Sequence, residues 1–153
     1  MAMFFEDFEP GQVFTTASHT ISEQEIIEFA SQWDKQPFHL DHEAAAASIY
    51  GGLIASGFHT LLISFNLVVE AAVWTKSSQG SPGMETIRFL RPVRPGDRLT
   101  VDFQVVSVRS SSTRGDRGYV LWDHTTKNQS GEDVLTFRST GISLRRNSAV
   151  DLE

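Results

Sequence analysis

The sequence contains no cysteine. Disulfide bonds, thiolate nucleophiles and cysteine-ligated zinc or iron–sulfur sites are therefore excluded together. Basic residues are also scarce, because 13 Lys and Arg stand against 19 Asp and Glu, for a formal net charge of −6. Nucleic acids and anionic membranes present phosphates that require a basic surface, so this charge disfavours both as partners. No spacing of His, Asp and Glu indicates a metal site, and none is expected.

Two further absences concern location. The N-terminal stretch MAMFFEDFEPG lacks a basic segment followed by a long apolar run, so we expect a cytoplasmic protein without a secretory signal. Residues 53–74 contain no Lys or Arg, and these 22 residues would be long enough to span a membrane. They include Ser, His, Asn and Glu, however, which are costly at bilayer depth. We therefore expect a long helix wrapped by the rest of a globular protein.

The pattern of the chain predicts a single α+β domain. Residues 21–75 have helical spacing, residues 80–145 alternate like strands, and neither a linker nor an internal repeat separates them. A chain of 153 residues is long enough to bury a real core. We expect one domain over residues 1–150.

Local signals place the elements of this domain. A first helix should begin at Ser22, which forms a capping box with Glu25, and should end near Trp33, ahead of Pro37. Asp41 is a good N-cap for a second, short helix through the alanines that follow it. The second half is rich in β-branched and aromatic residues, broken by Gly, Pro, Asp and Asn turns. The expected strands cover residues 13–20, 86–93, 98–109, 118–127 and 134–145.

A carboxylate and an imidazole flank the expected bend between the first two helices, in the run D-K-Q-P-F-H. Asp34 and His39 in such a bend can hold one water between them, so that one group accepts its proton while the other orients it or returns a proton. Neither group needs a covalent step, which favours hydration over group transfer. The simpler alternative is that Asp34 caps a helix end and His39 is an ordinary, partly buried histidine.

A second cluster, G-G-L-I-A-S-G, lies at the start of the long helix. Helix N-termini carry unpaired backbone N–H groups and the positive end of a dipole. The amide of Gly57 is thus placed to stabilise an enolate oxygen, with Ser56 and His59 beside it as candidate substrate contacts. Alternatively, these glycines serve only turn geometry and close helix–sheet packing.

Taken together, the motifs resemble the MaoC-like dehydratase family. The specific one is D-x-(N/Q)-P-x-H at residues 34–39, followed by a short alanine-rich helix and a glycine-led helix. Two more stretches extend the similarity over essentially the whole chain: F-E-P-G-Q-V-F at residues 8–14 and R-P-V-R-P-G-D at residues 91–97. The resemblance implies a hot-dog fold, in which an antiparallel sheet of about five strands wraps around a long central helix. It also implies a homodimer or a higher oligomer of dimers.

The activity implied by the resemblance is (R)-specific hydration of an enoyl thioester, or dehydration of a 3-hydroxyacyl thioester. The substrate would be carried on coenzyme A or acyl-carrier protein, and no cofactor beyond that carrier is implied. Asp34 and His39 match the water-activating pair of the family, and Gly57 matches its oxyanion glycine. This sequence departs from the family in two places: Gln36 replaces the commoner asparagine, and Phe65 stands where certain hydratases have a serine.

Two other functions remain open from the sequence. A hot-dog thioesterase would use a carboxylate elsewhere on the long helix, such as Glu70, to direct water at the carbonyl carbon. A non-catalytic module would bind acyl thioesters without turnover, which the departures at Gln36 and Phe65 would permit.

Overall fold

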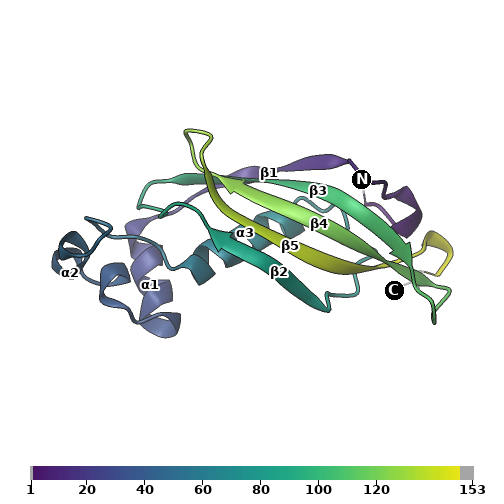
Figure 1. The fold of residues 1–153 in the computed structure, drawn as a ribbon, viewed down its shortest axis with the longest axis horizontal. Coiled ribbons are helices and arrows are strands. Elements are labelled where there is room, and N and C mark those ends of the chain that lie inside the picture. The colour runs from purple at the N-terminus through teal and green to yellow at the C-terminus, as the bar shows by residue number, and fades with distance from the viewer. Residues whose placement is uncertain (1, 149–153) are drawn as a thin grey trace.

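The computed structural model describes residues 2–148 and contains one antiparallel sheet of five strands (Figure 1). The strands lie in the order β1-β3-β4-β5-β2, so β1 and β2 form the two edges. Their bounds are β1 (Val13–Thr20), β2 (Gly83–Phe89), β3 (Arg98–Ser110), β4 (Arg117–Lys127) and β5 (Asp133–Leu144). The prediction of an α+β hot-dog fold is confirmed by this sheet and by the helix that it curves around.

Strand β2 is the element whose predicted bounds differ most from the structure, because it starts earlier than residue 86 and ends well before residue 93. The pairing of β2 with β5 ends where the amides of Leu90 and Arg91 both donate hydrogen bonds to the carbonyl oxygen of Val134, at 2.9 and 3.4 Å. Pro92 then follows, and proline has no amide to continue the pairing.

The helices are α1 (Glu23–Trp33), α2 (His42–Ala47) and α3 (Gly57–Glu70), with short 3₁₀ turns η1 (Phe5–Asp7), η2 (Pro37–His39) and η3 (Arg146–Ser148). The capping box at the start of α1 is formed: Glu25 N donates to Ser22 Oγ, and Ser22 N donates to the Glu25 carboxylate, both at 3.1 Å. Figure 1 shows α1 and α2 gathered beyond one end of the sheet, while α3 runs beneath it.

The predicted long helix is shorter and less enclosed than the sequence suggested. Residues 53–56 are buried but not helical, and α3 begins at Gly57. Its inner face packs on the sheet, where Ser64 Oγ lies 2.7 Å from Thr126 Oγ of β4. Its outer face is bare, with Phe58 64% and Leu62 56% exposed. The reason is that a single sheet of this width covers only one side of the helix.

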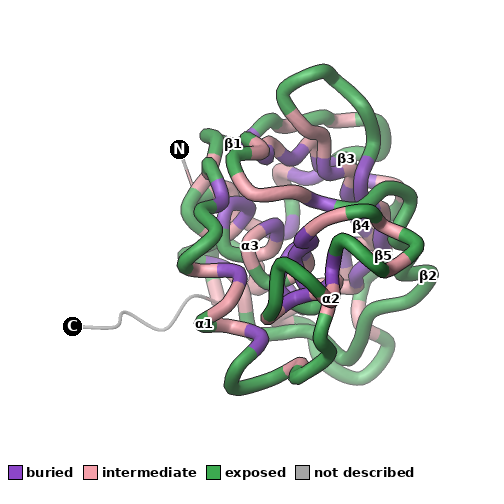
Figure 2. Tube along the Cα trace, turned by 90° about the vertical axis from the view of Figure 1, so that its left-hand side faces the viewer, coloured by how far each residue is buried: buried purple, intermediate pink, exposed green. Residues whose placement is uncertain are grey.

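The core lies between α3 and the concave face of the sheet, where Figure 2 shows the buried segments concentrated. Strand β4 alternates between buried and half-buried residues, and its buried row includes Trp122 and His124. No helix in the described part of the chain has the length and apolar character needed to cross a bilayer.

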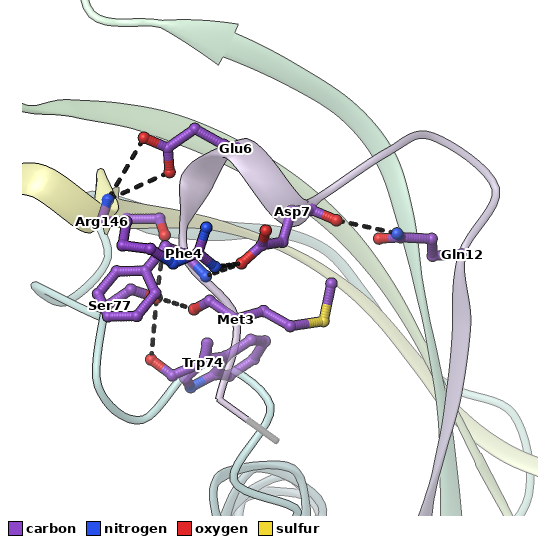
Figure 3. A network of polar contacts seen from close by, with 9 residues as sticks. Met3, Phe4, Glu6, Asp7, Gln12, Trp74, Ser77 and Arg146 are labelled. Carbon is purple, nitrogen blue, oxygen red and sulfur yellow. Dashed lines mark hydrogen bonds and ion pairs between the residues drawn. The ribbon is translucent and has the colours of Figure 1, made fainter.

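At the end of the sheet away from α1, a set of polar contacts fixes the N-terminal segment (Figure 3). Ser77 Oγ donates to the carbonyl oxygen of Met3 at 2.6 Å, and Phe4 N donates to Asp7 Oδ2 at 2.9 Å. Arg146 pairs with Asp7, and its amide donates to the Glu6 carboxylate at 3.2 Å. These contacts hold both ends of the described chain together, far from the bend that carries Asp34 and His39.

Candidate active site

The bend between α1 and α2 brings Asp34 and His39 together. Asp34 is the C-cap residue of α1, and Pro37 opens η2, the 3₁₀ turn that ends with His39. Proline is preorganised for the first position of a helical turn and disfavours helix in the residue before it. The chain therefore leaves α1 and folds back at once, which puts His39 Nε2 at 3.2 Å from Asp34 Oδ2.

The His39 ring is held in one orientation by the backbone. Its side chain is only 4% exposed, and Nδ1 lies 2.7 Å from the carbonyl oxygen of Ile54. A carbonyl oxygen can only accept a hydrogen bond, so Nδ1 carries a proton and donates it. Nε2 is therefore the atom available for chemistry, and it is the atom that faces Asp34.

The Asp34 carboxylate is held in its charged form. Partial burial raises the pKa of Asp34, but the hydrogen bond from Gln36, the nearby Ser56 hydroxyl and the neighbouring His39 ring outweigh it and bring this pKa below its usual value. Gln36 Nε2 donates to Asp34 Oδ1 at 2.8 Å, which leaves Oδ2 for His39. The longer Gln36 side chain thus supplies an amide donor to the carboxylate.

The N-terminus of α3 supplies a third component. The first hydrogen bond within this helix runs from Thr60 N to the carbonyl oxygen of Ser56, at 3.1 Å, so the amides of residues 57–59 have no acceptor in the helix. The Ser56 side chain does not cap them. Such a helix start favours negative charge near the amide of Gly57.

These components open into a single cavity of about 480 Å³. Four of the residues predicted from the sequence line it: Asp34, Gln36, His39 and Gly57. The other residues of its wall come from η2, the segment before α3, α3 itself, the end of β2 with the segment that follows it, and β5: Phe38, Tyr50, Ile54, Ala55, Phe58, Thr60, Phe89, Leu90, Arg91, Pro92, Val93 and Val134.

Two further candidates from the sequence lie outside this wall. His59 stacks on Phe29 of α1 at 4.4 Å between ring centroids, with its Nε2 4.0 Å from the Glu25 carboxylate. Burial lowers the pKa of His59, although the Glu25 carboxylate opposes this shift. Ser56 is fully buried, and its hydroxyl has no hydrogen bond of normal geometry to another described residue. Its proximity to Asp34 helps to lower the pKa of that carboxyl.

Sequence reasoning missed the aromatic part of the wall, to which Tyr50, Phe58 and Phe89 belong. The available signal was position: Phe58 follows Gly57 directly, and Phe89 precedes the R-P-V-R-P-G-D turn closely. Arg94 of that turn donates to the carbonyl oxygen of Tyr50 at 2.5 Å, which ties the turn to the loop before α3.

The carboxylate considered for a thioesterase lies elsewhere. Glu70 is the last residue of α3, and at about 1.5 Å per residue it is roughly 20 Å along the helix from Gly57. It is exposed and accepts a hydrogen bond from Asn66 at 3.0 Å. Phe65 lines a separate, smaller cavity near the same end of α3. Among residues 2–148, no three His, Asp or Glu side chains are grouped as metal ligands.

The fold and this cavity define a hot-dog protein with a polar pair and a helix N-terminus at one site. Comparison with protein families identifies the family, because residues 7–128 match the MaoC-like domain. The chain belongs to this family. Strand β5 lies beyond the matched residues but completes the same sheet.

Three individual proteins are also similar to this chain. The structure of a MaoC-like dehydratase from Rhodospirillum rubrum superposes with a TM-score of 0.87 and 39% identity, over 95% of this chain and 99% of that one. The uncharacterized protein YdeM of Bacillus subtilis is 38% identical over 106 residues, which are 69% of this chain and 73% of YdeM. A 3-hydroxybutyryl-CoA dehydratase of Methylorubrum extorquens is 30% identical over 111 residues, 69% of this chain and 66% of that protein.

Proposed function

We propose that this protein is a lyase that adds water to an α,β-unsaturated acyl thioester, or removes it from a 3-hydroxyacyl thioester. The observation that carries the proposal is that Asp34, His39 and the N-terminus of α3 line the same cavity. Water activation and stabilisation of an enolate oxygen are the two requirements of this reaction, and the cavity offers a candidate for each. The relative named as a 3-hydroxybutyryl-CoA dehydratase supports the same chemistry.

In the proposed hydration, one water in the cavity forms hydrogen bonds with both Asp34 Oδ2 and His39 Nε2, which lie 3.2 Å apart. Its oxygen forms a bond to the β carbon while its proton passes to the pair. The π electrons move onto the thioester oxygen, and the resulting enolate accepts a hydrogen bond from the Gly57 amide. The pair then gives a proton to the α carbon, so one water is added in total and no covalent intermediate with the protein forms.

The substrate class follows from this mechanism. A thioester carbonyl stabilises the enolate without help from a separate cofactor, so coenzyme A would enter only as the carrier within the substrate. Acyl-carrier protein is the alternative carrier. We further propose that the enzyme is cytoplasmic and acts as a homodimer.

A direct assay separates this function from its rivals. Purified protein is incubated with a panel of short-chain, medium-chain and branched enoyl-CoA thioesters, while enoyl absorbance and free thiol are measured in parallel. Hydration removes the enoyl absorbance without releasing thiol, and chiral analysis of the product should give the (R)-alcohol. Released thiol would instead indicate a thioesterase. Binding without turnover, equally tight in Asp34→Asn, would indicate a non-catalytic module.

A further inference from the structure

An aromatic ring occupies the space where a side chain at position 57 would lie. A Cβ atom built on Gly57 would be 2.7 Å from both Cε1 and Cζ of Phe89, much closer than carbon atoms pack. The backbone of Gly57 is not in the left-handed region that favours glycine. The ring of Phe89, rather than the backbone conformation, therefore sets the need for glycine at this position.

The ring of Phe89 flanks the amide assigned to the enolate oxygen. In an α-helix the Cα–Cβ direction leans toward the N-terminus, which is the end where the Gly57 amide has no partner in the helix. Phe89 is the last residue of β2 and lines the same cavity as Gly57. Its ring and the pair of Asp34 and His39 thus line one cavity from different elements.

We propose that Phe89 is a specificity-determining residue that selects against thioesters with a branch at the α carbon. This inference rests on the proposed hydratase function. With the thioester oxygen at the Gly57 amide and the β carbon at the water-holding pair, the α carbon lies between them. A methyl group on the α carbon must then share space with whatever covers Gly57, and Phe89 already covers it. A straight-chain substrate carries only hydrogen there.

A purely structural ring would behave differently. Phe89 is 53% exposed, so it also belongs to the apolar surface along the β2 edge. If it served only stability or assembly, its removal would lower turnover of straight and branched substrates by the same factor. The ratio of kcat/KM for the straight substrate to kcat/KM for the branched substrate reports on the contact with the α carbon. A loss of folded enzyme lowers both values equally and does not change this ratio.

The experiment compares kcat/KM for crotonyl-CoA and 2-methylcrotonyl-CoA in wild type, Phe89→Leu and Phe89→Ala. Met84→Ala is the matched control, because Met84 is an exposed apolar residue of the same strand outside the cavity wall. A single carbon in a hydrophobic pocket changes selectivity by about 10–200-fold. We expect the preference for the straight substrate to fall at least about tenfold in Phe89→Ala, less in Phe89→Leu, and not in Met84→Ala.

A second measurement does not depend on turnover. Calorimetric affinities for butanoyl-CoA and 2-methylbutanoyl-CoA should converge in Phe89→Ala and remain apart in wild type. An unchanged ratio in both measurements, or an equal change in Met84→Ala, would overturn the assignment of Phe89. Wild-type protein that turns over no enoyl-CoA would overturn the hydratase function itself, and the two failures are thereby distinguished.

Discussion

His39 Nε2 lies 3.2 Å from Asp34 Oδ2, while the other nitrogen of the ring donates to the carbonyl oxygen of Ile54. With Nδ1 protonated, a neutral ring presents a lone pair to a carboxylate oxygen. Two acceptors at this distance must share a proton or be bridged by the O–H groups of a water. Asp34 and His39 therefore act on one proton or one water as a unit, rather than as two independent groups.

The first prediction concerns this unit. Asp34→Asn keeps the shape of the side chain but removes the proton acceptor, so kcat on the best enoyl-CoA should fall by about 10²–10⁴-fold. His39→Ala should lose activity in the same range. Because the pair acts on one water, the double variant should lose little more than either single variant. Steady-state kinetics on the three variants test this, and wild-type turnover by Asp34→Asn would refute the water-activating role.

His59→Ala provides the control for that series. His59 is buried like His39 but packs on Phe29 beside Glu25, outside the cavity wall. Its removal should lower the free energy of unfolding while kcat per folded molecule stays near wild type. A loss of kcat comparable to that of Asp34→Asn would place His59 in the chemistry instead.

The second prediction concerns Gln36. Burial raises the pKa of Asp34, and the hydrogen bond from Gln36 is the first of several contacts that lower it. Gln36→Ala removes this donor, so the pKa of Asp34 should rise. Hydration requires the carboxylate and fails as pH falls through this pKa. The acidic limb of kcat/KM against pH should therefore move to higher pH in Gln36→Ala, whereas Gln36→Asn, which keeps an amide, should shift less. An unmoved limb would show that Gln36 does not set the charge of Asp34.

The sequence was informative about this site because its signals are local. The spacing of Asp34, Pro37 and His39 predicts the bend between α1 and α2. A helix that begins at Gly57 must leave its first backbone amides without acceptors in the helix. The bounds of the strands could also be predicted from the sequence wherever turns rich in Gly, Asp or Asn separate them.

What the sequence could not supply is contact between distant segments. Phe89 and Gly57 are in contact because β2 lies at the sheet edge beside the start of α3. The periodicity of apolar residues in the sequence does not predict such a contact. The outer face of α3 was expected to be covered, since Phe58 and Leu62 follow the same apolar pattern as its inner face. An apolar pattern predicts burial but does not say which molecule provides the cover.

The third prediction is a dependence of stability on pH through His124. The ring is fully buried on β4, stacked on Phe137 at 4.2 Å, with Nε2 2.8 Å from Ser139 Oγ. Burial lowers the pKa of His124 to about 4, against 6.5 for the free side chain. Between these values the unfolded chain binds a proton that the native protein does not, so stability is complete above pH 6.5 and falls as pH drops toward 4.

The effect of His124 is measurable by urea unfolding at pH 7 and pH 5. At about 1.4 kcal/mol per pH unit, this residue should account for a loss of roughly 2 kcal/mol between the two conditions. His124→Phe keeps the stacked ring and removes the titration, so its stability should fall less over the same interval. An identical fall in the variant and in wild type would assign the pH dependence to other groups.

The fourth prediction is that the protein forms a dimer through β2 and the outer face of α3. Every residue of β2 is exposed, and one edge of this strand has no partner within the described chain. Unpaired strand edges invite association, and contiguous exposed apolar surface marks interaction sites. Ile87 on β2 and Leu62 on α3 are both exposed, at 41% and 56%.

Light scattering on purified protein at micromolar concentration should give about twice the chain mass of 17.0 kDa. Ile87→Lys and Leu62→Glu place charges on the expected interface and should each shift the protein toward monomer. Val13→Lys is the matched control, since Val13 is an equally exposed apolar residue on β1, the opposite edge of the sheet. It should leave the dimer intact. A wild-type monomer would contradict the prediction, and dissociation by Val13→Lys alone would move the interface to the β1 edge.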